Sequence, residues 1–141
     1  MSVEIRTERL RLATKGEGDF VDITGELGRV LAESKLREGS LTVFGVGSTL
    51  GIAAFEYEPG LIRDMRELYR RLAPSDRRYA HDETWGEANG FSHLRAALQG
   101  QSLTVPFADG RLALGAWQQV VVAEFDNRPR QREVVVQIIG K

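Results

Sequence analysis

The sequence contains no cysteine and only two histidines among its 141 residues. The absence of cysteine excludes a disulfide scaffold, a thiolate zinc site and a cysteine nucleophile. A bound metal would therefore need His, Asp or Glu side chains, backbone carbonyls or water as its ligands. With cysteine excluded, the candidate catalytic side chains considered below are His, Asp and Glu.

The sequence also lacks an excess of charge and a long apolar run. Its formal net charge is -1, so no overall field attracts nucleic acid or an anionic membrane. The longest apolar runs, such as residues 120–123, are far too short to span a bilayer, and the first residues do not resemble a signal peptide. We expect a cytoplasmic protein with no membrane and no nucleic-acid partner. A length of 141 residues suits a single domain, residues 1–141.

The spacing of apolar residues predicts strands and helices in separate groups. Strands are expected at residues 3–12, 20–23, 41–46, 52–57, 102–106, 111–114, 117–125 and 133–139. Helices are expected at about residues 24–35, 59–72 and 89–100, with a loop over residues 73–88. The order is two strands, one helix, two strands, two helices and four strands. Because the elements are segregated, the predicted fold class is α+β, with mixed, largely antiparallel sheets and helices packed on one side.

Particular residues mark the ends of these elements. Pro59 suits the first position of a helix, where its missing N–H would be unpaired anyway. Asn89 is expected to cap the last helix, and Gly100 to end it. Asp109-Gly110 is a strong hairpin signal. Trp117 is expected in the core or at a subunit interface.

Both histidines lie in one short segment. His81 and His93 fall within residues 79–93, and Asp82 lies between them. Two neutral imidazoles and a carboxylate can hold one divalent metal (zinc, magnesium or calcium) and leave a position open for water or substrate. The same imidazoles can serve as general acid and base near neutral pH. The spacing matches no standard zinc pattern, and the alternative is one capping and one surface histidine.

The helical spacing places His93 beside the core rather than inside it. Asn89 and His93 are four residues apart and should project from one helix face. Phe91 and Leu94 occupy a different, apolar face of the same helix. Asn89 is therefore a candidate for substrate binding next to His93.

Two carboxylates are further catalytic candidates. Glu56 shares a strand face with Ala54, whose small side chain leaves room for a ligand. Asp64 lies at the edge of the apolar stripe of the helix over residues 59–72, from which it can reach a cleft. The alternatives are a strand-end glutamate that faces water and an ordinary boundary residue.

Anion binding has two weaker candidates. Residues 45–49 are rich in glycine and hydroxyl groups, so Ser48 and its neighbours can offer donors to an anion. The segment lacks the lysine of a P-loop, and a tight turn between strands is the alternative. Arg130 is a phosphate candidate through its charge. The arginines between residues 63 and 78 alternate with acids, which favours a solvated helix face over a nucleic-acid site.

Taken together, these motifs resemble the YjbQ-type family, from about residue 41 to the end of the chain. The resemblance rests on residues 56–61 with Asp64, and on residues 79–82, 89–94, 100–106, 110–118, 125–130 and 136–140. It implies an α+β fold with a mixed sheet and a homotrimer whose pockets lie near the subunit boundaries. It also implies a divalent-metal or anion site lined by His and acidic residues. The positions that match the family's site are Glu56, Asp64, His81, Asp82, Asn89, His93 and Gln118.

The resemblance also implies an activity. Members of the family are associated with thiamine phosphate synthesis, which joins a pyrimidine methyl diphosphate to a thiazole phosphate. Many members have His-Thr where this chain has Gly47-Ser48, so a third imidazole is missing, as in a Gly-Ser-Thr branch of the family. We expect a transferase that acts on a small phosphorylated heterocycle. The alternative is a non-catalytic trimer that binds a metabolite or a metal.

Overall fold

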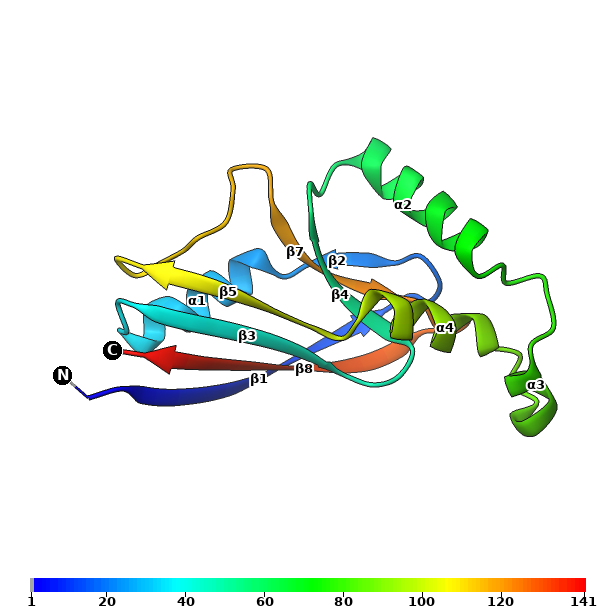
Figure 1. Ribbon diagram of the computed structural model, residues 1–141, viewed down its shortest axis with the longest axis horizontal. Helices are drawn as coiled ribbons and strands as arrows, with labels where there is room; N and C mark the ends of the chain where they lie inside the picture. Colours follow the sequence, from blue (N-terminus) through cyan, green and yellow to red (C-terminus); the bar gives the residue numbers. More distant parts are fainter. Residues whose placement is uncertain (1) are drawn as a thin grey trace.

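The computed structural model describes residues 2–141 and contains two antiparallel sheets packed against each other (Figure 1). The larger sheet has the order β1-β8-β3-β5-β6, and the smaller sheet has the order β2-β7-β4. The strands are β1 (Glu4–Thr14), β2 (Phe20–Asp22), β3 (Gly39–Val46), β4 (Leu50–Phe55), β5 (Ser102–Ala108), β6 (Arg111–Leu112), β7 (Gln119–Glu124) and β8 (Arg130–Gly140). The helices are α1 (Thr24–Ser34), α2 (Pro59–Leu72), α3 (Ala80–Trp85) and α4 (Gly90–Gln99).

The main hydrophobic core lies between the two sheets. Because side chains alternate along a strand, every second residue of β3 and β8 points inward, as Leu41, Val43 and Val136 do. Ile52 and Val122 of the smaller sheet face them. Helix α1 contributes one apolar stripe to the same core, formed by Leu27, Val30 and Leu31.

Helices α2 and α4 cover the other face of the smaller sheet and form a second core. In this core the rings of Tyr69 and Phe125 meet edge to face, with 4.6 Å between their centroids. Val121 of β7 points into this core, whereas Val122 points into the first one. The apolar run 120–123 is explained because β7 is buried on both faces.

The observed order confirms the predicted α+β fold, and every strand pair is antiparallel. The expected loop over residues 73–88 is wrong in one respect, since it contains α3. A helix of six residues is too short to show a helical period. The Asp82 carboxylate fixes it instead, because it accepts a hydrogen bond from the backbone N–H of Tyr79, the residue before the helix. No helix within residues 2–141 is long and apolar enough to cross a membrane.

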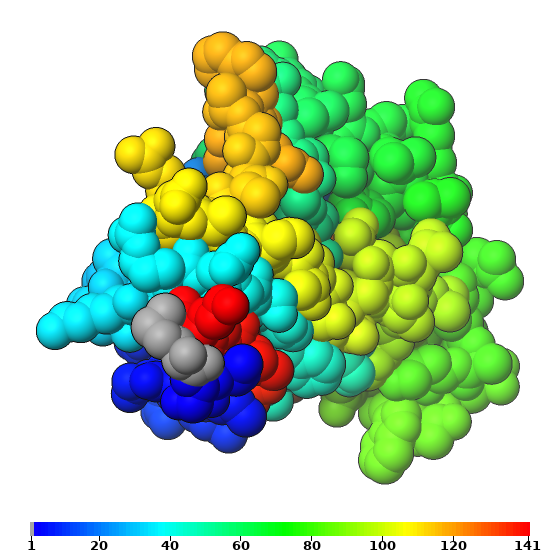
Figure 2. All heavy atoms as spheres, turned by 60° about the vertical axis from the view of Figure 1, so that its left-hand side comes forward, coloured from blue at the N-terminus to red at the C-terminus, as the bar shows by residue number. Residues whose placement is uncertain are grey.

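Other local predictions are corrected. Asn89 occupies the N-cap of α4, but its side chain makes no capping hydrogen bond. Strand β7 begins at Gln119 rather than at residue 117, and Trp117 is 75% exposed rather than in the core. Trp117 belongs to the β6–β7 loop, which stands out from the surface (orange in Figure 2). Strand β8 begins at Arg130, earlier than the expected residue 133.

Two buried carboxylates near the end of β7, Glu124 and Asp126, join separate parts of the chain. We call these two residues and their hydrogen-bond partners Thr14, Thr49, Asn89, Arg130 and Arg132 the carboxylate cluster. Glu124 Oε1 accepts hydrogen bonds from the Thr14 hydroxyl at 2.5 Å and from Arg132 Nε at 2.8 Å. Arg132 Nη2 donates to Glu124 Oε2 at 2.5 Å and to Thr49 Oγ1 at 2.7 Å. The cluster therefore connects β1, β7, β8 and the turn between β3 and β4.

Replacing Arg132→Met should strongly destabilise the protein, because it leaves Glu124 buried without its cation. We expect the free energy of unfolding to fall by roughly 3–5 kcal/mol, measured by urea denaturation. The matched control is Arg9→Met, which removes the exposed partner of Glu133, 3.1 Å away. This change should have a much smaller effect, since exposed ion pairs contribute little. Equal losses in the two variants would show that burial of the Glu124 charge is not what matters.

Candidate functional site

The two histidines meet where α3 approaches the start of α4. Their ring centroids are 4.4 Å apart and the ring planes are tilted by 38°. His81 lies in the first turn of α3, and His93 lies one turn into α4. We call these two side chains the histidine pair.

A glycine at position 90 allows this close approach. A Cβ atom on Gly90 would lie 2.8 Å from Tyr79 Cβ, 3.0 Å from Asp82 Oδ1 and 3.3 Å from His81 Cβ. Real carbon atoms do not come this close, so any other residue would push α3 away from α4. Gly90 thus holds His81 next to His93.

Asp82 fixes α3 to α4 and lies beside His81. Its carboxylate accepts hydrogen bonds from the backbone N–H groups of Tyr79 at 2.9 Å and Gly90 at 3.0 Å. The hydrogen bond from Tyr79, followed by the one from Gly90, keeps the pKa of Asp82 below its usual value. His81 Nδ1 lies 3.7 Å from Asp82 Oδ1 and is buried without a hydrogen-bond partner within residues 2–141. Nε2 is therefore the ring nitrogen of His81 that a ligand can reach.

A second carboxylate, Asp126, lies close enough to His93 to act on its pKa. It is fully buried and accepts a hydrogen bond from Arg130 Nε at 2.7 Å, and Arg130 Nη2 lies 2.6 Å from the same oxygen in an ion pair. The Asn89 amide and the Thr49 hydroxyl also donate to it, at 3.2 and 3.1 Å. Burial alone would raise the pKa of Asp126, but the hydrogen bonds led by Arg130 lower it below its usual value. Asp126 is therefore a carboxylate at neutral pH.

His93 is neutral at the same pH. Burial lowers its pKa, and the positive charge that His81 carries when protonated lowers it further. Asp126 and Glu87 act in the opposite direction, yet the pKa remains below the ordinary histidine value. A neutral imidazole beside a second imidazole can accept or donate a proton, or offer a lone pair to a ligand.

The fold brings together five of the residues singled out in the sequence: His81, Asp82, Asn89, His93 and Arg130. Asn89 contributes differently from the expected cap. A carboxylate only accepts hydrogen bonds, so its NH₂ group must face Asp126, and its buried Oδ1 has no partner within residues 2–141. Asp82 is engaged by backbone donors rather than directed at a ligand.

Other candidates lie elsewhere in the chain. Glu56 and Gln118 are exposed near the far end of β4, and Asp64 is exposed on α2. Glu56 lies six positions after Leu50, the first residue of β4, which corresponds to about 20 Å of extended chain. Helix α2 then runs from that end towards α3 (Figure 1). Ser48 is exposed in the turn between β3 and β4, next to Thr49, which donates a hydrogen bond to Asp126.

One chain does not provide a complete site for a divalent metal. Residues 2–141 contain no group of three His, Asp or Glu side chains close enough to share an ion. The histidine pair offers two ligands, and Asp82 is already bound by two N–H groups. Position 47 is a glycine and supplies no side chain; a Cβ there would lie 2.9 Å from Arg132 Nη1 and 2.8 Å from Leu50 Cδ2, so both of these side chains would have to shift. The positive φ of Gly47, 151°, also disfavours a side chain.

The carboxylate cluster contains the residues that sequence reasoning missed. Glu124 and Arg132 were not singled out, and Asp126 entered only as part of residues 125–130, one of the segments that carry the family resemblance. The available signal was a charged residue directly after the run 120–123, within a strand buried on both faces. A charge in such a position requires a buried partner.

Comparisons with known proteins give a consistent result. A family model described as "UPF0047 protein YjbQ-like" matches residues 8–141. A UPF0047 protein from Methanothermobacter thermautotrophicus is 38% identical over 139 residues, which cover 99% of this chain and 95% of that protein. A UPF0047 protein from Archaeoglobus fulgidus is 35% identical over 130 residues, covering 92% of this chain and 98% of the relative.

A solved structure supports the fold over its whole length. The crystal structure of a YbjQ-like protein of unknown function from Sulfolobus solfataricus P2 superposes with a TM-score of 0.92 at 26% identity. The superposition covers 99% of this chain and 100% of the other. The arrangement of strands and helices is therefore shared with a protein solved by crystallography.

The titration of His93 should depend on the presence of His81, in protein freed of metal with a chelator. Since burial and the His81 charge both disfavour protonation of His93, its midpoint should lie below about 6.5, the value of an unperturbed histidine. Replacing His81→Gln removes the second cause and should move the midpoint of His93 upward. Histidine ring signals followed by NMR against pH measure both values. An unchanged or lower His93 midpoint in the variant would contradict the coupling.

Proposed function

This chain belongs to the UPF0047 YjbQ-like family, and we propose that its histidine pair is the centre of a transferase that acts on a small phosphorylated heterocycle. The observation that carries the proposal is the 4.4 Å contact between the rings of His81 and His93. Two imidazoles in contact, one of them neutral because of burial, suit hydrogen bonding and proton transfer to a leaving oxygen.

In thiamine phosphate formation, a ring nitrogen of the thiazole phosphate attacks the methylene carbon of the pyrimidine methyl diphosphate. A C–N bond forms, the C–O bond to diphosphate breaks, and its electron pair remains on the diphosphate oxygen. An N–H group of the histidine pair can donate to that oxygen as its charge develops. Nε2 of His81 is suited to this role because Nδ1 faces Asp82.

Arg130 and Asn89 complete this end of the site. The Arg130 side chain is 31% exposed, so its guanidinium can donate to a phosphate oxygen while it remains bound to Asp126. Asn89 and Asp126 support His93 from the protein side. Ser48, in the neighbouring turn, adds a hydroxyl donor for the phosphate.

The remaining carboxylates suggest a site shared between copies of the chain. Glu56 and Gln118 lie at the opposite end of β4 from the carboxylate cluster, about 20 Å along the strand, and Asp64 is exposed on α2. A homotrimer in which one copy presents this end to the histidine pair of the next would unite them. Large apolar side chains exposed on the surface, among them Trp117 (75%) and Leu98 (65%), support such contacts.

A second function is a non-catalytic trimer that binds a phosphorylated metabolite or a metal. Two observations favour it: one chain lacks a third metal ligand within residues 2–141, and Asp82 is occupied by backbone donors. In this case the histidine pair recognises an anion or an ion without promoting bond formation. The metal, if bound, would need ligands from a neighbouring copy.

An activity assay separates the two functions. The purified protein should form thiamine phosphate from the two substrates, followed by chromatography. His81→Ala and His93→Ala should each lower the rate by about 10²-fold or more, as expected for loss of a proton-transfer group. Glu83→Gln, an exposed change on α3, is the matched control and should retain the wild-type rate. Wild-type and histidine variants at the same background rate would refute the transferase and leave the binding protein.

Mixing variants tests whether the site is shared. Glu56→Gln and His93→Ala should each be inactive alone, but subunits mixed after unfolding and refolding should regain activity. If equal amounts of the two variants mix at random in a closed ring, each half of a shared site is intact with a chance of about one half. About a quarter of the sites then have both halves intact. A mixture of Glu56→Gln with Asp64→Asn is the control, since both changes affect the same half and no recovery is expected. A lack of recovery in the first mixture as well would show that the two ends do not combine.

A further inference from the structure

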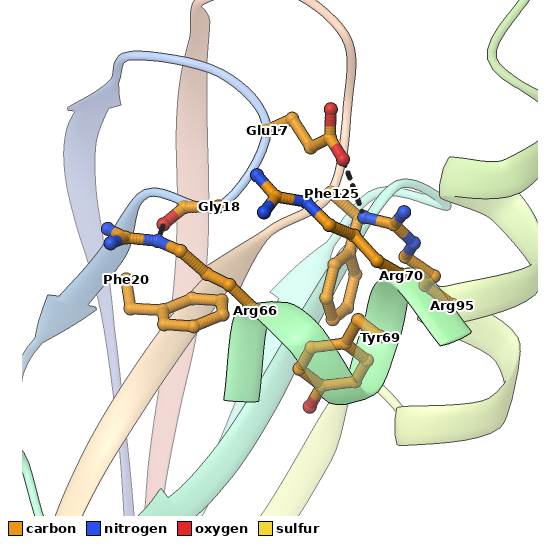
Figure 3. A pocket seen from close by; sticks show the side chains of 8 residues that line it. All are labelled: Glu17, Gly18, Phe20, Arg66, Tyr69, Arg70, Arg95 and Phe125. Carbon is orange, nitrogen blue, oxygen red and sulfur yellow. Dashed lines mark hydrogen bonds and ion pairs between the residues drawn. The ribbon is translucent and has the colours of Figure 1, made fainter. Parts of the chain in front are cut away.

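A small cavity lies between α2, α4 and the loop that joins β1 to β2 (Figure 3). Its volume is about 10 Å³, room for roughly one water-sized sphere. Arg66 and Arg70 reach it from α2, Arg95 reaches it from α4, and Glu17 closes it from the loop. Three guanidinium groups and one carboxylate therefore share one cavity.

Arg95 is the buried member of this group. It is only 2% exposed, and its Nη1 donates to Glu17 Oε1 at 2.9 Å while its Nε donates to the Ala73 carbonyl at 3.0 Å. Its Nη2 is buried and has no hydrogen-bond partner within residues 2–141. Burying a guanidinium with an unused donor is costly. The core thus contains an anion-binding group that the protein itself satisfies only in part.

The other two arginines leave positive charge at the mouth of the cavity. Arg66 Nε donates to the Gly18 carbonyl at 2.8 Å, a neutral partner. Arg70 is exposed and makes no ion pair with residues 2–141. Glu17 is therefore the single carboxylate opposite three cations.

Glu17 is placed where it can move. Its side chain is 27% exposed, and its two neighbours in the chain, Gly16 and Gly18, have φ values of 116° and 81°. Glycines in these conformations allow the loop to change direction without strain from a side chain. If the Glu17 side chain turns outward, the space of its carboxylate joins the cavity beside Arg95.

We propose that this cavity is a binding site for a tetrahedral oxyanion such as phosphate, and that the Glu17 carboxylate occupies the place of the anion in the free protein. The planar fork of Arg95 matches two oxygens of such an ion, and Arg66 and Arg70 add charge from the other side. The aromatic rings of Tyr69 and Phe125 line the cavity and limit its hydration. A phosphate ion that binds here replaces the Glu17 carboxylate rather than filling an empty space.

This site is distinct from the histidine pair. Arg95 and His93 are two residues apart on α4, so their side chains point about 200° away from each other around the helix axis. The anion site thus lies on the opposite side of α4. The inference does not depend on the proposed transferase activity.

The test is a calorimetric titration of the purified protein with inorganic phosphate at constant ionic strength, with chloride as the reference salt. Wild type should bind phosphate more tightly than chloride. Glu17→Gln should increase the affinity by about tenfold or more, because it removes the competing charge. Arg70→Gln should weaken binding, and Arg95→Met should abolish it. Arg71→Gln, an exposed change on the same helix whose partner is Glu67, should leave the affinity unchanged.

Each result decides the question. Phosphate binding no tighter than chloride binding, or an unchanged affinity in Glu17→Gln, overturns the proposal without the need for a buried substitution. In the His93→Ala variant, the phosphate binding that remains should still be strengthened by Glu17→Gln. If His93→Ala loses phosphate while Glu17→Gln and Arg70→Gln do not alter it, the anion binds at the histidine pair, and this site does not exist. Loss of transferase activity with phosphate binding retained would concern the proposed function alone.

Discussion

Two carboxylates without access to water, Glu124 and Asp126, occupy alternate positions along the chain where β7 ends. Each must find its hydrogen bonds inside the protein, because a buried charge without partners costs several kcal/mol. The backbone N–H of Asp126 donates to Glu124 Oε2 at 3.0 Å, so the two requirements are met in one cluster. Arg132 forms an ion pair with Glu124, and Arg130 forms one with Asp126. Strand β8 therefore begins where two arginines must point back towards β7.

The position of the histidine pair follows from this cluster. Asp126 holds Asn89 at the start of α4, and Asn127 Nδ2 donates to the Glu87 carbonyl at 2.9 Å just before that helix. The start of α4 is thus fixed from the β7–β8 turn. Asp82 then attaches α3 to the same point through the N–H of Gly90. The segments that carry His81 and His93 are thus joined to each other and to the β7–β8 turn, which keeps the two rings in contact.

Much of the fold could be predicted because its signals are local. The alternation of apolar residues in β3 and β8 and the stripe in α2 follow directly from the periods of strand and helix. Helix α3 could not be predicted this way, because its stability comes from two hydrogen bonds to Asp82 rather than from a periodic apolar face. The late start of β7 depends on the β6–β7 loop, where the Gln118 side chain accepts from the N–H of Gly115.

The candidate site was predictable only in part, for a similar reason. Residue type and proximity in sequence were enough to select His81, Asp82 and His93. The contribution of Asp126 depends on β7 reaching α4, a contact between residues 37 positions apart in the chain. Arg132 depends on an even longer-range contact, since its Thr49 partner is 83 positions away. Such pairs carry no local pattern, although a charge within a buried strand indicates that a partner must exist.

The separation of acidic and histidine residues has a topological cause. Strand β4 starts beside the carboxylate cluster and ends near Glu56. Helix α2 then runs back from that end towards α3, which carries His81. Any residue near the β4–α2 junction is therefore kept a full strand length from the histidine pair, whatever its side chain. No rotation of the Glu56 side chain can bridge that length within one chain. The charged groups that act on His93 in the same chain are therefore those near it, Asp126, Arg130 and Glu87.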